Sequence, residues 1–292
     1  MNFSEKLKEI RKKEGISQEQ LAEKIGVTRQ AITKWETGKG LPDVENMVII
    51  AEIFKTTIDE LLMDSVKKAV PETFVYTSET IYDIDCEKHF DVNIGNAAAI
   101  MLSSGDDEKL HVKLSSETLE NLSSMYKIKL DDRKNKLDVL CLNKNKLSRY
   151  EAEESLTVEI VLPNKYSDTC EIAASVKLLA INNLHLNRLE YDGDAEQVLI
   201  SDSSGSLELT AKTDYEITVD RITGRLDINQ WKAKAIIHIP EENIVNVINK
   251  GRKCNVYYVK EGKAAEYENA ADSENEISVS GIFSELVVDL VR

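Results

Sequence analysis

The stretch that decides the fold of the first part of the chain is "GISQEQLAEKIGVTRQAITKWETGKGLP", residues 15–42. Ser17, followed three residues later by Gln20, is a capping-box pattern, which predicts the start of a helix. Gly26 stands where a helix ends in the left-handed conformation, and Thr28 is placed to cap a following helix. The stretch therefore predicts two short helices joined by a tight turn that fixes the angle between them.

Apolar residues recur at helical spacing on both sides of this stretch. They predict a helix that ends near Gly15, a helix capped by Asp43, and a short last helix over "TTIDELL" (56–62). In the helix after Thr28, the apolar face holds Ala31, Ile32 and Trp35, so Trp35 is predicted to lie in the core. The residues left to face outward are Arg29, Gln30, Thr33 and Lys34.

Five short helices with a glycine turn between the second and third make a helix-turn-helix. Residues 3–64 resemble the Cro/repressor-type (Xre-like) DNA-binding domain, because "SQEQLA", "IGVTRQAITKWETG" and "PD" follow in that family's order and spacing. The resemblance implies that the third helix enters the major groove and that Glu36 pairs with Arg11 inside the domain. Donors, amides and hydroxyls suit base edges and phosphates, and the predicted DNA-binding residues are Gln18, Thr28, Arg29, Gln30, Thr33, Lys34 and Lys39.

The charge is distributed unevenly along the 292 residues, whose formal net charge is −15. Residues 1–42 hold nine Lys and Arg against six Glu, a net charge of +3, so the remainder carries −18. A basic first part on an acidic remainder points to one face that meets a polyanion. No apolar run reaches the roughly 18 residues of a membrane span, and the charged N-terminus lacks a signal-peptide apolar region. We therefore expect a cytoplasmic protein without membrane insertion.

The residues with catalytic or metal-binding chemistry form no known motif. The four cysteines lack zinc spacing and are predicted to be free thiols. In "YDIDCEKHFD" (82–91), acidic and histidine side chains alternate, and one solvated strand face is favoured over a metal site. No G-x-S-x-G, H-E-x-x-H or phosphate-binding glycine loop occurs, so no catalytic residue, cofactor or metal is predicted. The residues considered for the metal site are Asp83, Asp85, His89 and Asp91.

The rhythm of the sequence changes after the helical part. Pro71 and the loss of helical periodicity predict a linker over 65–80, followed by an all-β domain over 81–292. Only "SSETLENLSSMY" (115–126) suggests a helix in that domain. Alternating segments predict strands at 90–95, 109–115, 126–132, 136–143, 155–163, 185–191, 197–211, 215–231, 234–240 and 255–260.

An internal repeat favours a β-solenoid over a sandwich. "SSGSLELTA" and "ITGRLDINQ" share one pattern, and their glycines, Gly205 and Gly224, are 19 residues apart. A repeat of about twenty residues suits coils that stack on one another. Residues 155–260, and less closely 75–150, resemble the "toastrack" family of adhesin-like β domains, which implies stacked β-sheets.

Together these patterns predict a multidomain α plus all-β protein: a five-helix helix-turn-helix domain and a β-solenoid-like or stacked-sheet domain. The predicted function is sequence-specific, DNA-binding transcriptional regulation, with a β domain that senses a signal, ligand or protein partner. One alternative makes the β domain only an oligomerisation platform, and another makes the protein a DNA-targeted enzyme. The predicted partners are double-stranded DNA with a pseudo-palindromic operator and a second copy of the chain in a homodimer.

Overall fold

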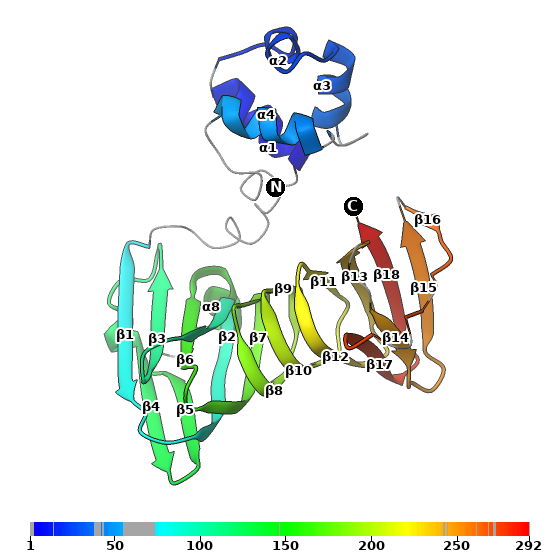
Figure 1. Ribbon diagram of the computed structural model, residues 1–292. Coiled ribbons are helices and arrows are strands. Elements are labelled where there is room, and N and C mark those ends of the chain that lie inside the picture. Colours follow the sequence, from blue (N-terminus) through cyan, green and yellow to red (C-terminus); the bar gives the residue numbers. More distant parts are fainter. Residues whose placement is uncertain are drawn as a thin grey trace. The chain divides into compact units, whose positions relative to one another are not determined.

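The chain forms two compact units, Met1–Thr73, which we call the head, and Phe74–Arg292, which we call the body (Figure 1). The computed structural model describes residues 3–13, 15–37, 42, 44–54, 74–145, 147–241, 243, 245–260, 262–267, 269–270 and 273–291. The predicted fifth helix at 56–62, the predicted cap Asp43 and residues 65–73 of the predicted linker lie outside these residues. Among the described helices, none combines the length and the apolar composition of a membrane-spanning helix.

The head contains four described helices: α1 (Phe3–Lys13), α2 (Gln18–Ile25), α3 (Arg29–Glu36) and α4 (Val44–Phe54). Their inward faces follow the periodicity of the sequence, and Trp35 is 7% exposed, as predicted. Since α2 and α3 are each only eight residues long, packing rather than intrinsic propensity stabilises them. The core that holds them consists of Leu7, Leu21, Ala22, Ile25, Ile32, Trp35 and Ile50.

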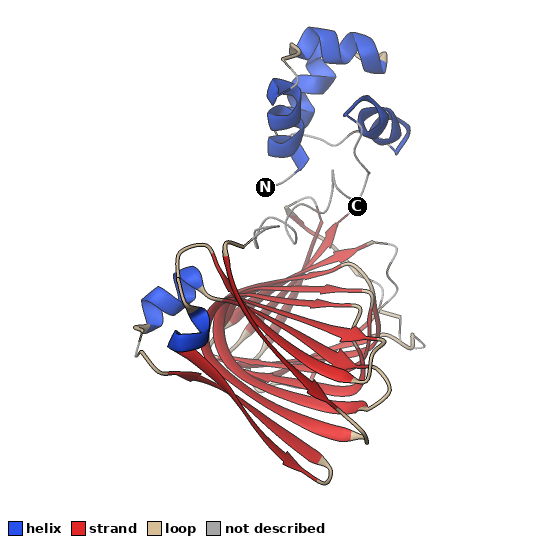
Figure 2. Cartoon of the chain, turned by 90° about the vertical axis from the view of Figure 1, so that its left-hand side faces the viewer, coloured by secondary structure: helices blue, strands red, loops and turns tan. Residues whose placement is uncertain are grey.

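The body is a β-solenoid, and Figure 2 shows its strands lying side by side and curving around a common core. Its first part contains β1 (Tyr76–Asp83), β2 (Lys88–Gly105), β3 (Lys109–Ser116), α7 (Leu122–Met125), β4 (Tyr126–Arg133), β5 (Lys136–Asn143), α8 (Arg149–Ser155), β6 (Thr157–Pro163) and β7 (Ser167–Asn182). Its second part contains β8 (His185–Asp192), β9 (Ala195–Ser201), β10 (Ser203–Ala211), β11 (Tyr215–Val219), β12 (Ile222–Trp231), β13 (Lys234–Pro240), β14 (Asn246–Asn249), β15 (Asn255–Lys260), β16 (Lys263–Ala264), β17 (Glu276–Ile282) and β18 (Glu285–Val291).

Parallel pairing builds two faces, and each coil contributes one strand to each face. On face A, the strands follow in the order β5, β2, β7, β8, β10, β12, β17 and β14. On face B, the order is β6, β2, β7, β9, β11, β13, β18 and β15. The long strands β2 and β7 run through both faces. Inside face A, one aliphatic ladder packs the coils together: Leu189, Leu207, Leu226, Ile277 and Val247.

The 19-residue repeat is the period of one coil. Gly205 pairs directly with Gly224 between β10 and β12, and Val198 pairs with Ile217 at the same spacing between β9 and β11. The prediction of a solenoid is confirmed. Two predicted strands, 197–211 and 215–231, are each divided into two by a corner of the coil, such as the one at Asp202, whose φ is +44°.

The repeated glycine is required because successive coils approach each other closely there. A Cβ on Gly205 would lie 1.8 Å from the carbonyl oxygen of Leu186, and one on Gly224 would lie 2.4 Å from that of Gly205. Both glycines also have positive φ angles, +121° and +117°. No other residue fits this position without moving the neighbouring coil.

Backbone strain alone would destabilise a Gly205→Ala variant by about 1–3 kcal/mol. We expect a larger loss of stability in the body, because the clash with Leu186 adds to this strain. Gly262→Ala is the matched control, since Gly262 also has a positive φ (+71°) but has no atom within 4 Å of the position that the added methyl group would take. Urea unfolding of the full chain, followed by the β signal in circular dichroism, measures both. Equal losses in the two variants would contradict the close-approach explanation.

The order of the last coils differs from their order in the sequence. β17 and β18 lie between the coil β12–β13 and the coil β14–β15. The chain thus builds the outer coil first and then returns to fill the space beneath it. Nothing in a local sequence pattern encodes this order, because each of these strands has the same alternating pattern.

Side chains cover the edge of β14 at one end of the solenoid. The hydroxyl of Tyr267 donates to the carbonyl of Val245 (2.7 Å), and the amide of Asn269 donates to the carbonyl of Val247 (3.0 Å). The side-chain oxygen of Asn269 also accepts from the N–H of Val247 (2.6 Å). These bonds replace a neighbouring strand, so this edge is not open for pairing. The strands outermost at the opposite end, β1 and β4, pair antiparallel with β3 and β5.

Three features of the first part of the body differ from the predictions. The linker does not extend to residue 80, because Tyr76–Asp83 forms β1 and pairs with β3 along its whole length. All side chains of β1 are at least partly exposed, so the sequence of this strand resembles a linker. The helix predicted at 115–126 is reduced to α7. The helix α8 was not predicted, although Ser148 and Glu151 form the capping box that signals it.

Candidate nucleic-acid interface

The turn between α2 and α3 has the geometry that the sequence predicts. Ser17 accepts a hydrogen bond from the backbone of Gln20, and the side chain of Gln20 bonds back to Ser17, completing the capping box of α2. Gly26 ends α2 with φ +83°, and its N–H donates to Ala22. Thr28 then caps α3 by accepting from the N–H of Ala31 at 3.2 Å. These local bonds fix how α3 projects from the head.

The outward face of α3 is polar and exposed along its length. Ile32 and Trp35 are buried on the opposite side of the helix. The side chains that remain on the surface are Arg29, Gln30, Thr33 and Lys34, and Thr28 is exposed at the N-terminus. The first N–H groups of α3 have no acceptor within the helix, so they are available to a phosphate oxygen.

A buried ion pair ties α3 to α1. Arg11 donates from Nε and Nη2 to the carboxylate of Glu36, the second bond measuring 3.0 Å, and also donates to the carbonyl of Ile16 (2.7 Å). Burial raises the pKa of Glu36, but the hydrogen bonds from Arg11 and Gln18 outweigh it, and the net effect lowers the pKa. Glu36 therefore stays ionised and holds the C-terminal end of α3 against α1.

Gln18 connects α2 to α3. Its amide nitrogen donates to Glu36 (2.8 Å), and the hydroxyl of Thr33 lies 3.3 Å from its amide oxygen and 3.0 Å from the carbonyl of Arg29. Gln18 and Thr33 thus bond to the protein itself. Since the Gln18 side chain is only partly buried, its second amide hydrogen is free to reach a phosphate or a base.

The cations beside this face are solvated. Arg29 Nη1 lies 3.9 Å from the carboxylate of Glu19, and both side chains are mostly exposed, so the ion pair is weak. Lys34 is exposed in the last turn of α3. Of the residues that the sequence predicts to bind DNA, Lys39 lies outside the described residues. The structure brings Gln18, Thr28, Arg29, Gln30, Thr33 and Lys34 together on α2 and α3.

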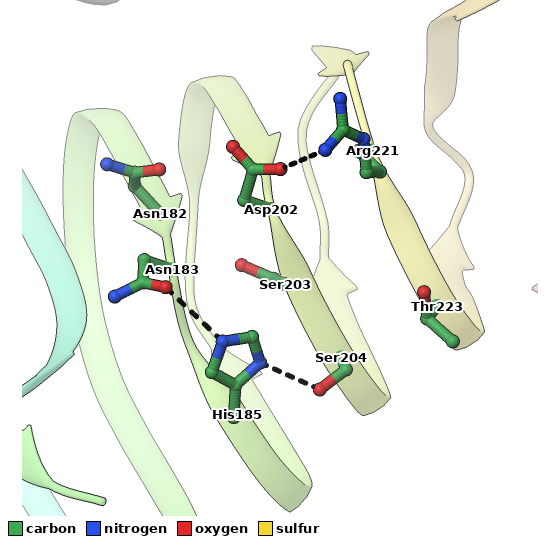
Figure 3. Close-up of a pocket in the computed structure, with 8 residues that line it drawn as sticks. All are labelled: Asn182, Asn183, His185, Asp202, Ser203, Ser204, Arg221 and Thr223. Carbon is green, nitrogen blue, oxygen red and sulfur yellow. Dashed lines mark hydrogen bonds and ion pairs between the residues drawn. The ribbon is translucent and has the colours of Figure 1, made fainter.

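The described residues of the body form one polar pocket between neighbouring coils. The shallow pocket in Figure 3 is lined by polar corner residues that already bond to one another. His185 bonds to Ser204 (2.8 Å) and Asn183 (3.2 Å), and Arg221 pairs with Asp202 (3.0 Å). The bond from His185 to Ser204 and the ion pair of Arg221 with Asp202 link one coil to the next, which gives them a structural role.

The segment 82–91 does not form the single strand face that the sequence predicts. β1 ends at Asp83 and β2 begins at Lys88, so a turn separates its acidic residues. Asp83 pairs with Lys109, and Asp91 pairs with Lys136. Within the described part of the chain, no group of three or more His, Cys, Asp or Glu side chains is placed to hold a metal. The four cysteines are free.

Comparison with known proteins identifies the class of the head. The helix-turn-helix family matches residues 7–61. The chain is 52% identical over 62 residues to the HTH-type transcriptional activator BcrR of Enterococcus faecalis, which is 21% of this chain and 30% of BcrR. It is 37% identical over 84 residues to the HTH-type transcriptional regulator YqaE of Bacillus subtilis, which is 25% of this chain and 72% of YqaE. The chain therefore belongs to the helix-turn-helix transcriptional regulators.

The part that these relatives share with this chain is the head. The match spans about a third of the length of BcrR and about half of the length of a third relative, RstR. RstR is the transcriptional repressor of a cryptic phage of Vibrio cholerae. It is 41% identical to this chain over 61 residues, which cover 21% of this chain and 54% of RstR. Among solved structures, a candidate cell adhesion protein from Clostridium sporogenes aligns with 74% of this chain and 100% of its own, at 15% identity and a TM-score of 0.36. A candidate adhesin from Bacteroides fragilis aligns at 10% identity, with coverages of 74% and 98% and a TM-score of 0.34.

Proposed function

We propose that this protein is a sequence-specific regulator of transcription that reads DNA through the exposed face of α3. The proposal rests on the difference in exposure between the two sides of α3. Ile32 and Trp35 are buried on one side, and Arg29, Gln30 and Lys34 are exposed on the other. Gln30 has the amide geometry to pair with an adenine edge. Arg29 and Lys34 suit guanine edges or phosphates, and Gln18 and Thr28 suit phosphates.

We further propose that the protein binds as a homodimer to a pseudo-palindromic operator. One recognition helix reads only a few base pairs, so useful specificity needs two heads on half-sites about 34 Å apart, one turn of the duplex. A two-fold dimer matches such an operator directly. In the body, β1 and β4 are outermost strands with one described partner each, and they are candidate places for the contact between copies.

The body is proposed to couple DNA binding to a signal, a ligand or a protein partner. Its acidic net charge, −14 over residues 74–292, repels the duplex, so the body itself contributes nothing to DNA affinity. The alternative is that the body serves only to assemble two heads. A change in operator affinity when a partner binds the body supports coupling, whereas an unchanged affinity supports the platform alone.

The test begins with selection of DNA by the full chain from a pool of random duplexes. We expect an enriched sequence with two related half-sites, protected as two patches about one helical turn apart in a footprint. Light scattering at the same protein concentration is expected to show a dimer. A pool that shows no enrichment would contradict sequence-specific recognition, and a monomer that binds the selected site with full affinity would contradict the dimer.

A further inference from the structure

Three neighbouring coils of the body turn from face A to face B through the same unusual backbone conformation. At this corner Lys232, Phe283 and Lys253 all have positive φ angles of +52° to +55°. The turns stack directly, since the N–H of Lys232 donates to Ile282 (3.1 Å) and the N–H of Phe283 donates to Arg252 (3.2 Å). Equivalent side chains therefore project from one line along the outside of the solenoid.

Most of the exposed side chains along this line are basic or aromatic. Trp231 is 58% exposed and Phe283 is 53% exposed, and Trp231 pairs with Ile282 on the next coil. Lys253 Nζ lies 4.7 Å from the centre of the Phe283 ring. Ala211 pairs with Gln230, the residue before Trp231. Lys212 follows Ala211, so it stands at the position equivalent to Trp231 and extends the line by one coil. We call this surface the basic–aromatic ridge: Lys212, Trp231, Lys232, Arg252, Lys253 and Phe283.

The cations of the ridge have no carboxylate partner in the described part of the chain. Many basic side chains of the body do pair with carboxylates, for example Lys88 with Asp132, Lys136 with Asp91 and Arg188 with Glu208. Within the described residues, none of the four cations of the ridge makes an ion pair, and all four are exposed.

The acidic residues nearest in sequence do not neutralise the ridge. The carboxylate of Asp214 accepts the backbone N–H of Lys234 (2.8 Å). Glu285 begins β18 and lies in register with Lys234 on face B. The ridge therefore keeps four exposed cations without ion pairs to described residues, on a body of acidic net charge, and such a local excess of positive charge attracts a polyanion.

We propose that the basic–aromatic ridge docks the body on an anionic lipid surface. The ridge is the outer corner of a solenoid, hence convex, and a convex surface meets a flat layer more readily than it encloses a peptide. Exposed Trp and Phe side chains gain little from the backbone of duplex DNA. At a membrane, they enter the headgroup region while the flanking cations meet the lipid phosphates.

The remaining charge of the body orients this contact. Attraction and repulsion both decay within a Debye length, about 8 Å at physiological salt, so the ridge alone faces the lipid when it is in contact. Faces A and B point elsewhere. The proposed membrane binding is peripheral and reversible. It is a second binding activity beside the DNA recognition proposed for the head, and it uses a surface of the body.

The test uses the full chain and two kinds of vesicle, one of neutral phosphatidylcholine and one in which part of that lipid is replaced by anionic phosphatidylglycerol. We expect co-sedimentation with the anionic vesicles only. The triple variant Lys232→Asn, Arg252→Asn, Lys253→Asn keeps side chains that tolerate a positive φ. It is expected to bind about a hundredfold more weakly, because each cation near the surface contributes roughly fivefold.

Tryptophan fluorescence gives a second measurement, because the chain has two tryptophans and Trp35 is buried in the head. The emission is expected to shift to shorter wavelength on binding, and Trp231→Phe is expected to remove the shift. The matched control is the triple variant Lys127→Asn, Lys129→Asn, Lys134→Asn, which removes three exposed charges from β4 and the turn after it, at the other end of the solenoid, and leaves binding unchanged.

Circular dichroism must show that each variant is folded before its binding is compared. Equal binding to both kinds of vesicle, no binding to either, or full binding by the triple variant would each overturn the proposal. A further result would also overturn it: the parent chain does not bind vesicles, and the triple variant loses affinity for random duplex DNA. The ridge would then be a nucleic-acid-binding surface. A loss that is as large in the β4 control would assign the effect to net charge, and that result also overturns it.

Discussion

Truncation of the chain after Ser273 is expected to abolish cooperative unfolding of the body. The truncation removes β17 and β18, which lie between the coil β12–β13 and the coil β14–β15. The edge of β12–β13 would be open to water, and β14–β15 would have no partner beneath it. Buried apolar side chains such as Val279 and Val288 would be lost from the core as well.

Thermal unfolding, followed by the β signal, measures this effect, and a dye that binds exposed apolar surface reports the open coils. Truncation after Leu290 is the control, because it keeps nearly all of the pairing of β18. Val279→Ala is a milder variant and is expected to destabilise the body by roughly 2 kcal/mol through the cavity it leaves. A body that unfolds as cooperatively without β17 and β18 as with them would contradict the strand order.

Glu36→Ala is expected to destabilise the head by about 3–5 kcal/mol, because it leaves the buried guanidinium of Arg11 without its counter-charge. The side chains of Arg11 and Glu36 are 11% and 2% exposed, so water replaces the lost partner poorly. The variant also removes one of the two hydrogen bonds that join Gln18 to α3, the bond to Glu36. Urea unfolding of the full chain, followed by the helical signal, is the measurement.

The controls for Glu36 separate charge from packing. Glu19→Ala removes an exposed carboxylate and is expected to change stability by no more than about 0.5 kcal/mol. The double variant Arg11→Met, Glu36→Leu removes both charges and is expected to recover most of the loss. If Glu36→Ala were as mild as Glu19→Ala, the buried pair would not hold α3 in place.

The pair also makes the stability of the head depend on pH. The folded-state pKa of Glu36 is lower than the unfolded-state pKa. Its contribution is therefore complete above the unfolded-state pKa and is lost as pH falls through the folded-state pKa. We expect the stability difference between the parent chain and Glu36→Gln to shrink on acidification, and a difference that grows would contradict this sign.

The head was predictable from sequence because its determinants are local. Ser17 with Gln20, Gly26 and Thr28 each act within one turn of helix, and the structure shows all of these caps. The outward face of α3 follows from the spacing of Ile32 and Trp35. The bond from Gln18 to Glu36 was not predicted, because it joins residues that are 18 apart in sequence and depends on how the helices pack.

The body was predictable in class but not in order. The pairing of Gly205 with Gly224 follows from a repeat that is visible in the sequence. The return of β17 beneath β14 depends on contacts between distant strands, and alternation cannot distinguish one partner from another. The sequence of β1 has the composition of a linker because its side chains are mostly polar and all at least partly exposed, although the strand pairs along eight residues.

The most direct test of the central claim is the affinity ratio between the selected DNA site and a scrambled site. For Gln30→Ala we expect the affinity for the selected site to fall by about 1–3 kcal/mol, while the affinity for the scrambled site stays unchanged. Lys34→Ala, if it contacts phosphate, is expected to weaken both sites equally and to reduce the salt slope by about one unit. Gln197→Ala, an exposed glutamine of β9 in the body, is the control and is expected to change neither. An unchanged ratio for Gln30→Ala at low salt would contradict DNA reading by the outward face of α3.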